Sequence, residues 1–448
     1  MTLSVILAAA MLCAAGCSFK IPAEQGSTIH NGSDDKPGTD PGTVTNTFGD
    51  GVIGERKEGK SGKTFFEGII DSLIPGRKSL SGKAEMEAYP AEAAYGPIGD
   101  YPVPLPGGDV IGSYDDQIQA GLLTAGEIKD IKDVANWISL WNEADWAALR
   151  RSRGLYADNI ITASVLPFSA VELLDGDSVV YRAVSDIYGN ATLIFPDSLA
   201  GKELTVKSGE QSATVTCKRG ESVSLTQNVR FAPQNAKSLD LMLMIDTTGS
   251  MGDELEYLKV EIRDMINRIR AEQDISIRLS VNFYRDEGDD YIVKYYDFRD
   301  DIDDCVKILG EQSANGGGDY PEAVHTALGN VLQHSWRDDS VKLCFFVLDA
   351  PPHEESEIQG INAGMLKDVT AIAANGVRII PVVSSGADLS VEALMRGFSV
   401  MTGGTYLFLT NHSGIGGDHQ TPTDTQFDVE PLNDCMVRVI KEYVFVKS

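Results

Sequence analysis

LDLMLMIDTTGSMGDELEYL, residues 239–258, joins an apolar run to a polar loop and then to an amphipathic segment. The apolar run has the composition of a buried strand, and the segment that follows has the periodicity of a helix. Two interpretations of the polar loop are open. Its hydroxyls can cap the helix that begins near Gly252, with Asp246 held by backbone amides, or its oxygens can bind a metal ion.

Strand-like and helix-like segments alternate along the chain after Ala236. We predict strands at 238–246, 276–286, 291–298, 341–349, 377–384 and 404–410, and helices at 252–272, 301–312, 321–335, 357–375, 388–402 and 429–444. The stretches LCFFVL and VRIIPVV are apolar throughout, which is typical of parallel strands covered on both faces. The fold class predicted for residues 237–448 is therefore α/β, with a doubly wound, mostly parallel sheet.

Carboxylates follow two of these predicted strands. Asp246 ends the first strand and Asp349 ends KLCFFVLD, so both are expected at the carboxyl rim of the sheet, where open α/β sheets bind ligands. Between them, ANGGGDYPEA places Asp319 in a glycine-rich loop. Carboxylates and hydroxyls without nitrogen or sulfur suit Mg²⁺, with Mn²⁺ or Ca²⁺ as alternatives.

The segment DTTGSM resembles the Asp-x-Ser-x-Ser metal-ion-dependent adhesion site of von Willebrand factor type A (vWA) domains. The resemblance covers roughly residues 237–448. It implies that Asp246, Thr248, Ser250 and Asp349 bind a divalent cation, with Thr248 in place of a serine. The middle loop departs from the family, because Asp319 stands where a threonine is expected and binds the ion either directly or through a water. The implied function is cation-dependent binding of another protein or a matrix component.

Further residues are expected at this rim or behind the ligands. They are Asp286, Glu322, His353, His412 and His419. Each also has a plain structural interpretation. Asp286 can belong to a solvated turn in RDEGDDY, Glu322 can be an acid in the first turn of a helix, and the three histidines can stabilise their loops. The long loop that carries the last two histidines could instead contact a partner or a second ion.

The main enzyme alternative is a metal-dependent phosphohydrolase of the haloacid-dehalogenase type, which also uses an Asp at the end of its first strand. That mechanism requires a second Asp two residues later as general acid, and this chain has Thr248 there. No serine lies in a nucleophile elbow. We therefore predict a binding protein without catalytic residues. Two further functions stay open, namely a metal-independent scaffold of a cell-envelope complex and a role like that of the cytoplasmic vWA proteins that assist ring ATPases.

The N-terminal sequence predicts export. The apolar run in MTLSVILAAAMLCAAGCSFK is shorter than the ~20 residues that span a bilayer, and AAGC resembles a bacterial lipobox. We predict a lipoprotein signal peptide at 1–16, lipidation of Cys17, and a flexible, poorly structured tether at 17–115. The protein would then be anchored by its lipid to a membrane of the cell envelope.

Two further regions precede the α/β part. Residues 116–157 are predicted to be helical, with Thr124 as N-cap and Glu127 completing a capping box. Three tryptophans in this segment are expected to dock it on a neighbouring domain, or to form a sugar-stacking platform: Trp137, Trp141 and Trp146. Short alternating runs at 158–232 predict a small β-sandwich similar to immunoglobulin-like or carboxypeptidase-regulatory modules.

Charge and cysteine spacing exclude other classes. The 448-residue chain has 38 basic and 66 acidic residues, and its net charge of −28 opposes binding to nucleic-acid phosphates. KEGKSGKT resembles a phosphate-binding loop but has Lys57 where the first glycine is required. The cysteines after Cys17 have no CxxC spacing, so neither a structural zinc site nor a disulfide framework is indicated.

Overall fold

The computed structural model describes residues 118–226, 231–272, 275–423 and 426–447. The predicted signal peptide, Cys17 and the tether at 17–115 lie outside the described residues. Within the described ranges, no helix combines the length and the apolar character needed to cross a membrane.

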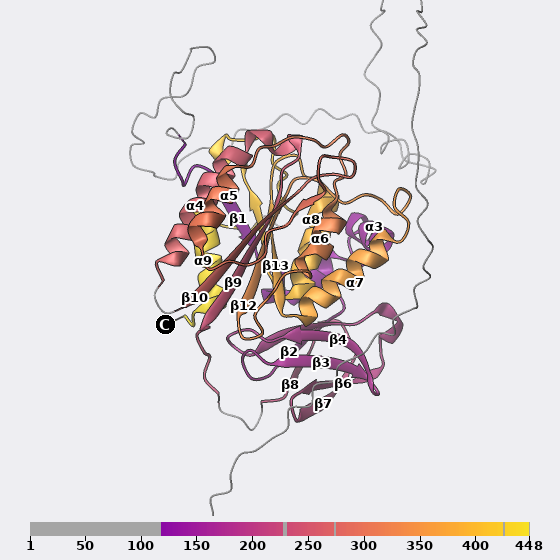
Figure 1. Ribbon diagram of the computed structural model, residues 1–448. Coiled ribbons are helices and arrows are strands. Elements are labelled where there is room, and N and C mark those ends of the chain that lie inside the picture. The colour runs from indigo at the N-terminus through magenta and orange to yellow at the C-terminus, as the bar shows by residue number, and fades with distance from the viewer. Residues whose placement is uncertain (1–117, 227–230, 273–274, 424–425, 448) are drawn as a thin grey trace, which may run out of the picture. The chain divides into compact units, whose positions relative to one another are not determined.

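An eight-stranded sheet lies at the centre of the C-terminal part (Figure 1). Its strands, in spatial order, are β11 (Val293–Lys294), β10 (Ser276–Tyr284), β9 (Ser238–Asp246), β12 (Val341–Leu348), β13 (Val377–Val383), β14 (Tyr406–Leu409), β1 (Thr124–Ile128) and β15 (Glu430–Pro431). Strands β10, β9, β12, β13 and β14 run parallel, whereas β11 and β1 pair antiparallel with their neighbours. The predicted α/β class with a mostly parallel sheet is confirmed.

Helices cover both faces of this sheet (Figure 1). One face carries α4 (Leu255–Arg270), α5 (Ile302–Gly310) and α9 (Leu432–Val444), and the other carries α6 (Val324–Val331), α7 (Ile361–Ala374) and α8 (Leu389–Thr402). All nine residues of β9 are buried. Leu241 and Leu243 pack toward α4, while Met242 and Met244 pack toward the opposite helices. This two-sided burial explains why Leu241–Ile245 of the strand are all apolar.

Several elements are shorter than predicted. The helix expected at 252–272 begins only at Leu255, because Gly249–Asp253 form a 3₁₀ turn. The helix expected at 321–335 is reduced to α6, since the backbone of Glu322 donates to the carbonyl of Pro351 instead of entering a helix. The strand expected at 291–298 is regular only in β11.

The capping-box helix predicted from Thr124 is wrong, because these residues form β1. The strand pairs with β14 on one side and β15 on the other. Gly126 faces Phe408 across the ladder, and a Cβ atom on this glycine would come within 2.4 Å of the Phe408 ring. Backbone pairing and this close approach therefore override the local helix signal.

The helical part of this segment starts later and packs on α8. It comprises the 3₁₀ turn Asp130–Lys132, α2 (Val134–Leu140) and α3 (Ala144–Arg153). Its three tryptophans contact one another edge to face, with ring centroids 5.1–6.0 Å apart. The guanidinium of Arg396 on α8 lies over the rings of Trp137 and Trp146. The cluster is buried, which leaves no open stacking platform on its indole rings.

Residues 160–224 form two smaller sheets. One contains β5 (Asn190–Ile194), β2 (Ile160–Ser164) and β8 (Glu221–Ser224), and the other contains β4 (Ser178–Val184), β3 (Ala170–Asp175), β6 (Glu203–Ser208) and β7 (Gln211–Thr216). The strand pairs are antiparallel except β2 with β8. The Tyr181 hydroxyl donates to the carbonyl of Met401 over 2.6 Å, which ties β4 to α8.

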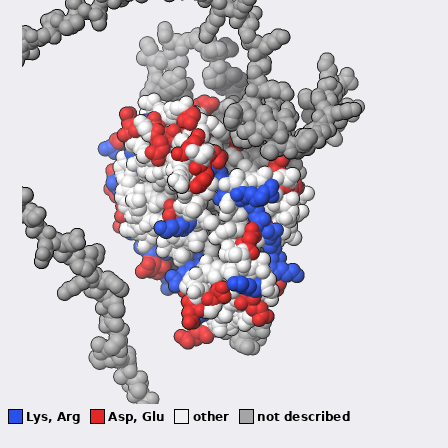
Figure 2. Space-filling model, turned by 90° about the vertical axis from the view of Figure 1, so that its right-hand side faces the viewer, with Lys and Arg blue, Asp and Glu red and all other residues white. Residues whose placement is uncertain are grey.

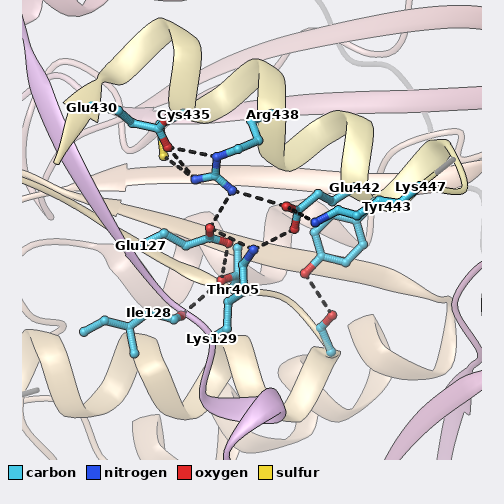
Figure 3. A network of polar contacts seen from close by, with 11 residues as sticks. Glu127, Ile128, Lys129, Thr405, Glu430, Cys435, Arg438, Glu442, Tyr443 and Lys447 are labelled. Carbon is cyan, nitrogen blue, oxygen red and sulfur yellow. Dashed lines mark hydrogen bonds and ion pairs between the residues drawn. The ribbon is translucent and has the colours of Figure 1, made fainter. Parts of the chain in front are cut away.

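A polar network ties β1 to the last helix (Figure 3). Arg438 on α9 pairs with Glu127 at 2.7 Å and with Glu430 at 2.5 Å, while Lys129 donates to Glu442 over 2.7 Å. Beside this network lies a cavity of about 780 Å³, bounded by β1, the small sheets and α9. Its walls do not include the carboxylates that end β9 and β12, so the rim of the sheet, and not this cavity, holds the candidate functional site.

Candidate metal centre

The sheet brings the two predicted strand-end carboxylates to one rim. Strands β9 and β12 are parallel neighbours, and Ile245 pairs with Val347, so Asp246 and Asp349 emerge from adjacent strands at the same end. Both side chains are buried. Figure 2 shows acidic side chains gathered at the upper end of one face, which is the end where the parallel strands of Figure 1 terminate.

The first loop turns its hydroxyls toward Asp246. Oδ1 of Asp246 accepts hydrogen bonds from the backbone amide of Thr248 over 2.8 Å and from its hydroxyl over 2.7 Å. The hydroxyls of Thr248 and Ser250 are 3.1 Å apart. Neither the 3₁₀ turn nor α4 has a side-chain cap, so the interpretation in which these hydroxyls cap the helix is wrong.

The glycine-rich loop lies directly on the first loop. The amide of Gly249 donates to the carbonyl of Gly316, and the amide of Asn315 donates to the carbonyl of Thr247. Gly316 and Gly317 both have positive φ, and a Cβ on Gly317 would lie 3.0 Å from Oε1 of Glu322 and 3.4 Å from Cβ of Thr248. The loop thus buries Glu322 beside Thr248.

Three carboxylate oxygens in this cluster have no donor. Oδ2 of Asp246, Oδ1 of Asp349 and Oε2 of Glu322 are buried and have no well-formed hydrogen bond within the described residues, although the buried hydroxyl of Tyr284 lies against the Asp246 carboxylate. A buried anionic oxygen without a partner is costly, and a divalent cation bound beside Asp246 and Asp349 would lower that cost. With the hydroxyls of Thr248 and Ser250, the donor set is oxygen only and fits Mg²⁺.

The pKa values of these carboxyl groups reflect their crowding. Burial and the charge of Asp349 raise the pKa of Asp246 to about 7. Burial raises the pKa of Asp349 to about 6, although a hydrogen bond from Ser250 opposes the shift. Burial and the charges of Asp246 and Asp286 raise the pKa of Glu322 to about 9. Without a cation, the folded protein therefore holds protons at this site near neutral pH.

Asp319 lies in another group of side chains. It is exposed, and its carboxylate lies within 4.8 Å of ligand atoms of His353 and Glu357. His353 is buried, and its Nε2 is 2.8 Å from Oδ1 of Asp286. Asp286 and His353 thus contact each other, as neighbours of the Asp246 cluster rather than as isolated loop residues.

The two later histidines lie in the loop after β14. His419 is buried, and its Nε2 is 2.9 Å from Oε1 of Glu254. The amide of Ser385, in the loop after β13, faces both oxygens of the same Glu254 carboxylate at 3.3 Å. His412 is exposed, and its Nδ1 is 3.3 Å from the Thr410 hydroxyl. The contact between His419 and Glu254 therefore holds the loop after β14 against the end of the first loop. His412 contacts Thr410 instead of Glu254.

Sequence reasoning missed two residues beside the site. Glu254 follows Ser250 within the next turn of the chain, and its charge contributes to the raised pKa of Asp349. Tyr284 pairs with Asp246 across β10 and β9, and its buried hydroxyl lies against that carboxylate. The end of β10, one strand from β9, was the available signal for Tyr284. Glu254 stands directly before α4, where an acid is common, so no local signal distinguishes it.

Comparisons with known proteins support the family suggested by the first loop. Residues 240–377 match the family model of the von Willebrand factor A domain. The chain is 28% identical over 191 residues to a putative ariadne-like RING finger protein of Acanthamoeba polyphaga mimivirus, covering 39% of this chain and 18% of that protein. It is 26% identical over 141 residues to the alpha-protein kinase vwkA of Dictyostelium discoideum, covering 30% and 22%.

The matched region contains the first loop, the glycine-rich loop and Asp349. The match and the mostly parallel sheet support a vWA domain protein, and such a domain suggests protein–protein interaction or adhesion. The chain spans only 18% and 22% of the lengths of these two relatives. Their RING-finger and kinase descriptions therefore concern proteins that are mostly outside the similarity.

We expect the stabilisation of the chain by Mg²⁺ to grow with pH. The folded pKa values of Asp246, Asp349 and Glu322 lie above their unfolded values near 4, so without metal these groups lower stability progressively as pH rises from about 4 to 9. Mg²⁺ must displace these protons and binds more tightly once they have left. Thermal unfolding with and without Mg²⁺ at pH 5.5, 7 and 8.5 measures the difference, and equal Mg²⁺ increments at all three would contradict the assignment.

Proposed function

We propose that this chain binds a divalent cation, Mg²⁺ or in its place Mn²⁺ or Ca²⁺, through Asp246, Thr248, Ser250 and Asp349, with Glu322 beside them. Through this ion it would bind another protein or a component of the matrix or cell envelope. The observation that carries the proposal is the set of buried carboxylate oxygens without donors on Asp246, Asp349 and Glu322. When bound, the ion supplies a coordination position that a partner's oxygen can fill.

We propose binding without catalysis. The position that a phosphohydrolase needs for its general acid is occupied by Thr248, whose hydroxyl donates to Asp246 and so serves that carboxylate. A metal-independent scaffold of a cell-envelope complex remains the second candidate. It is favoured by the contacts between the small sheets and the α/β part, such as the hydrogen bond from the Tyr181 hydroxyl to the Met401 carbonyl.

We also propose that the protein is exported and held at the cell envelope by a lipid on Cys17. The support is the lipobox-like AAGC, and an export signal disfavours a cytoplasmic role beside a ring ATPase. Cys17→Ala should release the protein from the membrane fraction into the soluble fraction of the cell envelope or the medium. A variant that stays membrane-bound would refute lipid anchoring through this cysteine.

A pull-down from cell-envelope extract tests the binding function. The wild-type chain is used as bait with Mg²⁺ and with EDTA, and a variant with Asp246→Ala and Ser250→Ala serves as metal-deficient bait. A partner retained only by the wild type with Mg²⁺ supports cation-dependent binding. A partner retained by both baits in EDTA supports the scaffold. Hydrolysis of generic phosphate esters by the purified wild type would support the phosphohydrolase instead.

Glu322 and Asp319 are expected to differ in their effect on Mg²⁺ affinity. Glu322→Gln removes a carboxylate beside Thr248 and should weaken Mg²⁺ binding on the order of tenfold above pH 9, where the raised pKa leaves this group ionised. Asp319→Asn removes an exposed charge that lies with His353 instead, and should change the affinity by less than about twofold. Isothermal titration with Mg²⁺ measures both variants. If Asp319→Asn weakened Mg²⁺ binding more than Glu322→Gln does, Asp319 and not Glu322 would belong to the Mg²⁺ site.

A further inference from the structure

A second group of potential ligands lies at the junction of two rim loops. Asp319 belongs to the glycine-rich loop between α5 and α6, and His353 and Glu357 belong to the segment between β12 and α7. Their ligand atoms all lie within 4.8 Å of one another. Segments about 35 residues apart in the sequence thus place one nitrogen and two carboxylate oxygens at one point.

The ring of His353 is held in the orientation of a metal ligand. Its side chain is buried, and Nε2 is 2.8 Å from the carboxylate of Asp286. With a proton on Nε2, the ring donates to Asp286 and leaves the lone pair of Nδ1 facing Oε2 of Glu357 at 3.2 Å. Two acceptors facing each other require a cation or a second proton between them. A carboxylate behind the distal ring nitrogen is the usual support of a metal-binding histidine.

Glu357 is fixed independently of the ring. The backbone amide of Glu354 donates to the same Oε2 over 2.9 Å, which holds this carboxylate beside His353. A further ring, that of His325, lies edge-on to His353 with centroids 6.3 Å apart, and its buried Nδ1 has no hydrogen-bond partner among the described residues. His325 therefore lies next to the three residues whose ligand atoms converge, but is not one of them.

The donor chemistry differs from that of the Asp246 cluster. Mg²⁺ takes oxygen ligands, whereas one imidazole with two carboxylates suits a borderline ion such as Zn²⁺, which accepts three protein ligands and an open fourth position. We propose that Asp319, His353 and Glu357 form a second cation site, specific for a divalent transition ion of the Zn²⁺ type. Asp286 would act as a positioning residue behind His353.

Such an ion would join the two rim loops. Asp319 precedes Glu322 by three residues on the same loop, and the Glu322 amide already donates to the carbonyl of Pro351, just before His353. An ion in the second site would therefore hold the exposed part of the glycine-rich loop, which contains Asp319, against the segment that contains His353. The buried part of the same loop contains Glu322. The second site does not depend on the proposed function, because none of its three ligands belongs to the Asp246 cluster.

The test uses the tag-free full chain, stripped with EDTA and kept in saturating Mg²⁺ so that the oxygen-only site is occupied. Zn²⁺ is titrated by calorimetry and Co²⁺ by visible absorption. We expect one equivalent of either ion in the wild type and in the variant with Asp246→Ala and Ser250→Ala, and visible Co²⁺ bands without a thiolate charge-transfer band. The latter variant separates failure of this site from failure of the proposed Mg²⁺ site.

Substitutions at the exposed ligands decide the assignment. Asp319→Asn and Glu357→Gln should each weaken Zn²⁺ binding on the order of tenfold or more, and Asp286→Asn should weaken it within the same range through His353. Asp290→Asn removes an exposed acid from the nearby acidic turn and should leave Zn²⁺ affinity unchanged. Three results would each overturn the proposal. They are a wild type that binds no Zn²⁺, variants Asp319→Asn and Glu357→Gln that bind Zn²⁺ as tightly as the wild type, and a thiolate charge-transfer band in the Co²⁺ spectrum. The first result would leave a proton as the bridge between His353 and Glu357.

Discussion

The variant with Asp246→Ala and Ser250→Ala should lose all stabilisation by Mg²⁺ or Mn²⁺. Asp246 contributes a fully buried carboxylate with one oxygen lacking a donor, and Ser250 adds the second hydroxyl of the same loop. At a free cation concentration of 100 times Kd, a bound ion stabilises the folded state by about 2.7 kcal/mol. For a chain of this size we expect the wild-type Tm to rise by roughly 4 °C.

A second readout separates a lost site from a damaged fold. Without metal, the variant should be about as stable as the wild type or more so, because one of the crowded carboxylates has been removed. Asp338→Asn is the matched control: this exposed acid precedes β12 at the opposite end of the sheet, and its loss should leave the cation effect intact. A Tm increase that survives in the variant with Asp246→Ala and Ser250→Ala would refute the site.

The core of the candidate site could be predicted from local sequence. Asp246 and Asp349 each follow a run of at least five apolar residues, and parallel strands that are neighbours must end at one rim. Thr248 and Ser250 alternate with Asp246 at the start of a turn, so their hydroxyls lie on the same side of it. These contacts depend on short stretches whose geometry follows from strand periodicity.

The choice between Asp319 and Glu322 could not be made in this way. Both acids belong to the glycine-rich loop, and which of them turns inward depends on backbone angles at Gly316 and Gly317 that only glycine adopts readily. A Cβ on Gly316 would lie 2.4 Å from Oδ1 of Asp289, in the turn after β10, so the loop direction is set by contact with a distant segment. No local pattern encodes that contact.

The edge of the sheet was hidden for a similar reason. Thr124 and Glu127 have the spacing of a capping box, yet they form β1, because β14 and β15 offer unpaired backbone on both sides. Glu127 consequently faces Arg438 on α9 rather than the start of a helix (Figure 3). A strand contributed from more than 270 residues away in the sequence cannot be recognised from a short window alone.

Arg396→Ala should be strongly destabilising. The guanidinium is fully buried, donates over 2.9 Å to Asp130 and over 2.8 Å to Glu392, and lies over the Trp137 and Trp146 rings. Its removal withdraws the counter-charge from two buried carboxylates, for which we expect a loss of about 3–5 kcal/mol. Urea unfolding followed by tryptophan fluorescence measures it, because three of the four tryptophans lie in this cluster.

The charges rather than the volume of Arg396 should account for most of this loss. A triple variant, with Arg396→Met, Asp130→Asn and Glu392→Gln, removes all three charges while filling most of the same space, and should recover most of the lost stability. Arg182→Ala is the matched control, since this exposed arginine pairs with Glu172 at the surface and should cost less than about 1 kcal/mol. If the triple variant is as unstable as Arg396→Ala, packing against the tryptophans, and not charge, holds the helical segment on α8.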